Sequence, residues 1–258
     1  MEIQNELWAS ISNMYRKDFF DKLGIEYNKE QGGLLEGTGL WTNQGEELRF
    51  ATMPHIGPKY GEATTKILFV GLDIGKDEVR SIQTFSDRCA SLCSWPSNAH
   101  MFGTYMEALY FLRPAEWTVV MERCRDLTNQ RALEYISKEY PSVLELGNYF
   151  ALTNYYKFVT EGRSERSGGE NRQDYDIAAL TDEILQKEIE ILKPDIIWFQ
   201  GRRLSPEKYQ KLADQGYIVY VAYHPSVRGR CIWGRRPSYI KHITEDYRTG
   251  VYGKYIKK

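Results

Sequence analysis

The chain has 258 residues, 42% of them hydrophobic and 14% aromatic, and a formal net charge of −1. This composition excludes a disordered chain, and four cysteines are too few for a secreted disulfide scaffold. No apolar run reaches the roughly 18 residues that a membrane span needs, and the N-terminus lacks the apolar core of a signal peptide. We therefore expect a cytoplasmic protein that does not bind a membrane.

The hydrophobic pattern predicts helices and short apolar strands that follow one another along the chain. Residues 1–45 favour a helical extension that ends in a glycine-rich stretch, and residues 51–65 favour a loop because proline and glycine recur there. Strands are predicted at residues 67–70, 149–158, 195–200 and 217–223. Helices are predicted at residues 105–112, 131–140, 181–192 and 239–247, and Pro114 ends the first of these helices.

Apolar strands separated by helices are typical of a parallel sheet that is covered on both faces. We therefore predict an α/β fold with three layers, α/β/α, around a short central, mainly parallel sheet. The chain is expected to be a monomer with a single domain over residues 1–258. An N-terminal helical extension covers about residues 1–50 of it, and a basic C-terminal segment covers about residues 224–258.

The charge is divided unevenly along the chain. Residues 224–258 contain nine Lys or Arg and two acidic residues, a net charge of +7, so residues 1–223 carry −8. A basic segment that also contains Trp233, Tyr239 and Tyr247 is typical of a surface that faces phosphates. The last six residues, GKYIKK, instead favour an ordinary solvated tail.

Polar side chains follow three of the predicted strands, at the edge where parallel sheets collect their functional residues. GLDIG places Asp73 between glycines that allow a ligand to approach the backbone closely. TNYYK offers Asn154, whose amide suits a planar hydrogen-bonding edge, and HPS offers His224 at the end of a buried strand. Each of the three also suits an ordinary turn or cap.

In this order, the three strand ends resemble the motifs of the uracil-DNA glycosylase superfamily. GLDIG is similar to the family's first motif, HPS is similar to its second, and TNYYK is similar to the TN-x-x-K of one branch. The resemblance covers about residues 66–230. It implies a uracil-DNA-glycosylase-like sheet and a monofunctional DNA glycosylase, with DNA as its partner, in single or double strands.

The resemblance also implies roles for individual residues. Asp73 supplies an anion on the sugar side and holds the attacking water, while His224 donates a hydrogen bond to the departing base. Phe85 stacks on the flipped base, and Val227 or Arg228 fills the gap in the duplex. The expected base-binding residues are Asn154, Phe85, Gly71, Leu72 and Gly75. The expected DNA-binding residues are Lys157, Ser226, Val227, Arg228, Arg230, Arg235 and Arg236.

The expected substrate is uracil or a modified or damaged pyrimidine, in a repair or a phage-defence role. The strictest uracil-specific branch has a Tyr that blocks the pyrimidine 5-position, and this chain has Gly75 there. The iron–sulfur branch has two cysteines before the first motif, where this chain has none. We therefore expect no cofactor and no metal, with Cys89, Cys93 and Cys124 as ordinary thiols.

Two alternatives remain open from the sequence. The same fold could be a non-catalytic nucleic-acid-binding protein, although Asp73 and His224 together favour an enzyme. A nucleoside or sugar hydrolase is a second alternative, and it would need no basic loop after His224. A Rossmann-type nucleotide binder is disfavoured, because no G-x-G-x-x-G follows the strand at residues 67–70.

Overall fold

The computed structural model describes a central sheet and helices around it. The described residues are 2–23, 27–28, 33–34, 48–50, 54–72, 99–124, 127, 129–160, 178–201 and 204–222. The predicted helix at residues 239–247 and the basic segment lie outside them.

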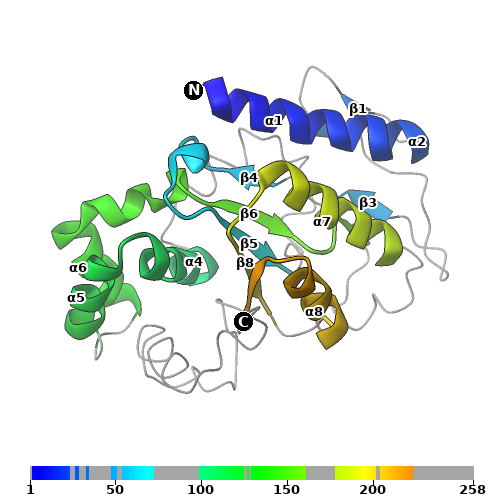
Figure 1. Cartoon of the computed structure of the whole chain (residues 1–258). Helices are drawn as coiled ribbons and strands as arrows, with labels where there is room; N and C mark the ends of the chain where they lie inside the picture. The colour runs from blue at the N-terminus through cyan, green and yellow to red at the C-terminus, as the bar shows by residue number, and fades with distance from the viewer. Residues whose placement is uncertain are drawn as a thin grey trace.

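A five-stranded sheet forms the centre of the described structure (Figure 1). Its strand order is β4-β6-β5-β8-β9, and all neighbours are parallel except the edge strand β4, which is antiparallel to β6. The strands are β4 (His55–Ile56), β6 (Ala151–Asn154), β5 (Ile67–Gly71), β8 (Ile196–Gln200) and β9 (Ile218–Ala222). Every residue of β5 and β8 is buried, as apolar strands covered on both faces should be.

Helices cover both faces of this sheet. On one face lie α1 (Glu2–Met14), α7 (Ala178–Leu192) and α8 (Pro206–Asp214), and on the other lie α4 (Ala99–Leu112), α5 (Pro114–Cys124) and α6 (Asn129–Glu139) (Figure 1). Side chains of β5 alternate between the two cores, because Leu68 and Val70 face α7 while Ile67 and Phe69 face α4. The predicted three-layer α/β fold is therefore confirmed.

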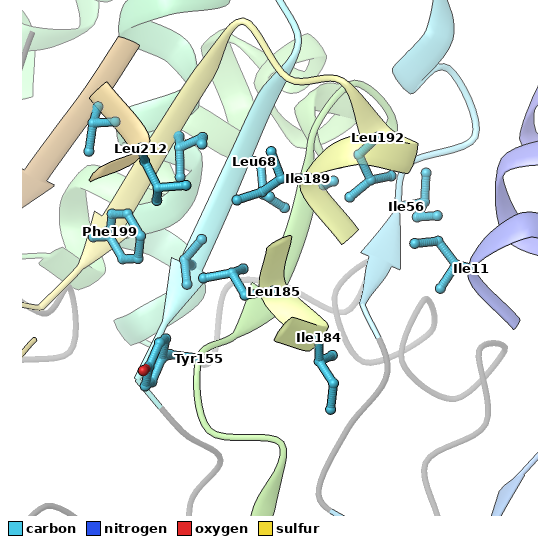
Figure 2. Packing of buried hydrophobic residues seen from close by; sticks show 14 of the residues in the cluster. Ile11, Ile56, Leu68, Tyr155, Ile184, Leu185, Ile189, Leu192, Phe199 and Leu212 are labelled. Atoms are coloured by element: carbon cyan, nitrogen blue, oxygen red, sulfur yellow. The ribbon is translucent and has the colours of Figure 1, made fainter. Parts of the chain in front are cut away.

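The core beneath α7 joins elements from α1 to β9. Figure 2 shows Ile184, Leu185, Ile189 and Leu192 of α7 in one cluster with Leu68 of β5, and Ile11 of α1 beside Ile56 of β4. All of these side chains are at most 5% exposed. The N-terminal helix is thus packed into the same core as the central strands.

The helical prediction for residues 1–45 is confirmed for most of residues 2–23 and is wrong at residues 27–28 and 33–34, which form strands. Helix α1 continues as a π-helix, Tyr15–Phe20, and ends in α2 (Asp21–Leu23). Two short strands then pair antiparallel, β1 (Tyr27–Asn28) and β2 (Gly33–Leu34). Gly33 disfavours a helix in this segment, because glycine loses more backbone freedom in a helix than any other residue.

Short elements account for the other differences from the sequence. The expected loop at residues 51–65 contains β4 and a 3₁₀-helix, Tyr60–Glu62. Strands β3 (Leu48–Phe50) and β7 (Phe158–Thr160) pair antiparallel in a separate two-stranded sheet. Pro114 follows the end of α4 as expected, but it also begins α5, where a proline fits the first turn. A second 3₁₀-helix, Pro141–Asn148, connects α6 to β6.

Candidate functional site

Four residues form a row across the carboxyl edge of the sheet, in the order Asn154, Gly71, Gln200 and Ala222. Gly71 of β5 pairs with Asn154 of β6, and Gln200 of β8 pairs with Ala222 of β9. Val70 pairs with Phe199, so Gly71 and Gln200 are at the same level in neighbouring strands. Side chains alternate between the two faces of a strand, so Gly71 and Gln200 lie on the same face as Phe69 and Trp198, two residues earlier. Phe69 and Trp198 belong to the core beneath α4, so the row lies on the face that α4 covers.

Gly71 and Asn154 approach each other closely. A Cβ atom at Gly71 would overlap the Oδ1 atom of Asn154, so the glycine leaves the space that the amide occupies. The two strands stay joined beyond this point, because the Tyr155 N–H donates to the Gly71 carbonyl at 2.7 Å and the Tyr156 N–H donates to the Leu72 carbonyl at 2.9 Å. Three of the expected base-binding residues, Gly71, Leu72 and Asn154, therefore lie together.

Gln200 ends β8 in a buried hydrogen-bond network that the sequence did not predict. Its Nε2 atom donates to Thr104 Oγ1 at 2.7 Å and to Glu107 Oε2 at 2.8 Å, and all three side chains have no exposed surface. A carboxylate oxygen accepts hydrogen bonds, so this contact fixes which end of the amide faces Glu107. A polar residue that ends an otherwise apolar strand, IIWFQ, is the signal by which the sequence could have identified Gln200.

Lys157 is buried, which differs from the DNA-facing position expected for it. Its side chain has no exposed surface, and its Nζ atom lies 2.8 Å from Glu188 Oε2 of α7 and 2.5 Å from Thr153 Oγ1. The expectation followed from the position of Lys157 in a strand-end motif. Its partner Glu188 lies 31 positions further along the chain, where no local pattern connects the two.

The other expected site residues lie outside the described residues. They are Asp73, Gly75, Phe85, His224, Ser226, Val227, Arg228, Arg230, Arg235 and Arg236. In the sequence, Asp73 directly follows Leu72, and His224 is the second residue after Ala222.

Cys124 is a free thiol inside the core beneath α4 and α5. Burial raises its pKa to about 11, so the unreactive thiol form dominates at neutral pH. Within the described parts of the chain, no three His, Cys, Asp or Glu side chains are grouped as metal ligands. Cys89, Cys93 and Cys231 lie outside those parts.

No helix in the described ranges is long and apolar enough to cross a membrane.

Comparison with known families gives one match that covers most of the chain. The model of the uracil DNA glycosylase superfamily matches residues 58–248, which include the row across the sheet edge as well as Asp73 and His224. No curated protein matches the chain significantly.

Proposed function

Because the chain belongs to the uracil DNA glycosylase superfamily, we propose that it is a monofunctional DNA glycosylase. It flips a pyrimidine out of DNA and hydrolyses its N-glycosidic bond. The observation that carries this proposal is the row at the sheet edge, where Asn154 is packed against Gly71 at the two strand ends that the family motifs identify. The chain continues from the same edge to Asp73 after β5 and to His224 after β9.

The reaction builds positive charge on the sugar and negative charge on the departing base, as in other glycosidic cleavages with an oxocarbenium-like transition state. Asp73 supplies the carboxylate on the sugar side and holds the attacking water. His224 donates a hydrogen bond to the base carbonyl as the charge develops there. Asn154, which the neighbouring strand holds in a fixed place, reads the pyrimidine edge with its donor and acceptor.

The base is uracil or a pyrimidine that is modified or damaged. Gly75 leaves the 5-position of the ring open, and Phe85 stacks on the ring face. Ser226, Val227 and Arg228 enter the duplex, and the arginines that follow His224 hold phosphates. Lys157 takes no part in DNA binding in this proposal, because Glu188 and Thr153 surround its ammonium group inside the protein.

The test is a panel of single- and double-stranded oligonucleotides, each with a different base, scored for abasic sites. The wild-type protein should excise the base from at least one of them, and the identity of that base separates a repair role from a role against modified phage DNA. Asp73→Asn and His224→Ala should keep the fold and lose about a hundredfold or more in rate.

Three results would contradict the proposal in different ways. Near-wild-type cleavage by either variant removes that residue from the mechanism. Binding to every oligonucleotide without abasic sites identifies a non-catalytic nucleic-acid-binding protein. Cleavage of free nucleosides without action on oligonucleotides identifies a nucleoside hydrolase.

A further inference from the structure

Four polar side chains from three distant segments meet behind Asn154. Glu188 of α7 accepts hydrogen bonds from Lys157 Nζ at 2.9 and 2.8 Å, from Thr153 Oγ1 at 3.2 and 3.0 Å, and from the Tyr15 hydroxyl. None of these four side chains has exposed surface. Thr153 precedes Asn154 in β6 and points to the opposite face of the sheet, so the network supports the strand end from behind.

Stability alone gives a weak reason for this network. When an ion pair is fully buried, the cost of removing both charges from water roughly cancels their mutual attraction. Apolar side chains of similar volume in the same place often stabilise a core equally well. What such a pair does provide is a single arrangement of the backbone, since each partner must stay in contact with the other.

In this protein, the backbone arrangement that the ion pair fixes is the bend that contains Asn154. Lys157 turns back so that its Nζ atom lies 2.5 Å from Thr153 Oγ1, which closes residues 153–157 into a short loop. The same loop is tied again to α7, because the Tyr155 hydroxyl donates to Asp182 Oδ1 at 2.5 Å. With the backbone hydrogen bonds to Gly71 and Leu72 in front, the peptide of Asn154 is held from both sides.

Tyr15 brings the N-terminal helix into this network. It lies in the π-helix Tyr15–Phe20, outside the residues 58–248 that match the family. An ion pair between Lys187 of α7 and Asp18, at 2.6 Å, attaches the same π-helix to α7. Burial raises the pKa of the Tyr15 hydroxyl well above its usual value, so Tyr15 remains a hydrogen-bond donor over the working pH range.

We propose that Tyr15 is a positioning residue for base recognition, which acts on Asn154 through Glu188, Thr153 and Lys157. The N-terminal helix is then part of the base-reading site, although it lies outside the family match. The proposal rests on the glycosylase function proposed above, because the role of Asn154 comes from it.

The chain provides a matched control for the loss of the Tyr15 hydroxyl. Tyr60 is also a buried tyrosine, 1% exposed, and within the described structure its hydroxyl has no hydrogen-bond partner. Tyr15→Phe and Tyr60→Phe therefore remove the same group from two buried sites, and only the first site adjoins the segment of Asn154.

Single-turnover rates test the proposal, on a duplex oligonucleotide that carries the base excised by the wild-type protein. We expect Tyr15→Phe to lower the rate about tenfold, since small displacements of a positioned group cost this much or more, and to leave the Kd for that duplex unchanged. Tyr60→Phe should match the wild type. In an Asn154→Ala background, Tyr15→Phe should cause no further loss, because residues that act through one another are not additive. Wild-type rates in Tyr15→Phe, or additive losses in the double variant, would overturn the proposal.

Amide hydrogen exchange separates this proposal from the proposed function. The N–H groups of Tyr155 and Tyr156 should exchange faster in Tyr15→Phe than in Tyr60→Phe, by about tenfold, if Tyr15 holds this segment in place. If the wild type excises no base from any oligonucleotide, the proposed function fails, and the exchange rates still decide whether Tyr15 positions Asn154. Equal exchange in the two variants would overturn the positioning.

Discussion

At the residue scale, the contact between Gly71 and Asn154 defines the candidate site. The strand pairing places the two residues opposite each other, and the amide oxygen of Asn154 fills the space beside the Gly71 Cα where another residue would have its Cβ. Glycine is needed here for a close approach and not for an unusual backbone angle, since Gly71 continues β5.

Gly71→Ala tests this contact. We expect the added methyl group to displace the Asn154 amide, lowering the rate of base excision by about a hundredfold, because this amide is the group that we propose reads the base. The variant should also be less stable, by about 1–3 kcal/mol for an overpacked core. Cleavage assays and denaturant unfolding measure the two effects.

The control is the double variant Gly71→Ala/Asn154→Ala, which removes the atom that the methyl group would meet. It should regain most of the lost stability and remain inactive. A single variant with wild-type rate and stability would show that the contact is unimportant.

The sequence predicted residues at this scale only where a local motif identified them. Gly71 and Asn154 follow apolar strands, so their meeting at one edge follows from parallel strand geometry. Lys157 belongs to the same motif, and a long cation at a strand end is usually solvated. Its burial depends on Glu188, Thr153 and Tyr15, and α7 and the N-terminal helix reach it only in the folded chain.

At the scale of elements, the contact between α4 and β8 supports the centre of the sheet edge. The Gln200 amide joins Thr104 and Glu107 of α4 at the end of a strand whose neighbours lead to Asp73 and His224. A buried network of this kind is stable when each member keeps a partner, and the amide is the group that can donate to the Glu107 carboxyl. This makes Gln200 sensitive to a change of charge.

Gln200→Glu should make stability fall as the pH rises. Two buried carboxyl groups in contact raise the pKa of the pair in the folded state above its value in the unfolded chain. A group with a raised pKa loses stability as the pH rises above the unfolded value, so the variant should approach the wild type near pH 4 and differ most near pH 8. Each unit of the shift corresponds to about 1.4 kcal/mol in the free energy of unfolding. Denaturant unfolding at several pH values measures this dependence.

An exposed pair of the same kind provides the control. Gln186 Nε2 donates to Glu190 Oε1 at 3.2 Å on the exposed surface of α7. Gln186→Glu should change the free energy of unfolding by less than about 0.5 kcal/mol at any pH, because water screens like charges there. Equal pH dependence in the two variants would contradict a buried carboxyl pair at Gln200.

Elements were predictable from the sequence in proportion to their length and apolar content. Strands β5, β8 and β9 have five residues each, are mostly apolar and were predicted, whereas β4 has two residues and lies in a segment rich in glycine and proline. Propensity could not distinguish a two-residue edge strand from a loop, because its pairing with β6 is a long-range contact.

At the scale of the whole molecule, the family match and the packed core have different boundaries. The match begins at residue 58, but Ile11, Tyr15 and Phe19 are packed into the core that covers the central strands. The sequence predicted the N-terminal helix, but the spacing of its apolar residues could not show which core the helix would join.

The uneven charge leads to a prediction about DNA binding by the whole molecule. Residues 224–258 carry +7 while the remainder carries −8, so a DNA contact made by the basic segment should depend strongly on salt. Each phosphate contact contributes a log–log slope of about −0.9 on duplex DNA, because binding releases counterions. The slope therefore counts phosphate contacts without any assumption about the base.

Replacing Arg235 and Arg236 with Ala should flatten this slope by about one to two units, whatever base the oligonucleotide carries. The matched control is Lys257→Ala/Lys258→Ala, which removes the same charge from the last residues of the chain and should leave the slope nearly unchanged. Titrations of fluorescent duplexes at several salt concentrations give both slopes. If the two double variants change the slope equally, net charge and not a local phosphate contact explains the binding. If the arginine variant loses stability while its slope stays at the wild-type value, the two arginines pair with acidic side chains of the protein and do not contact DNA.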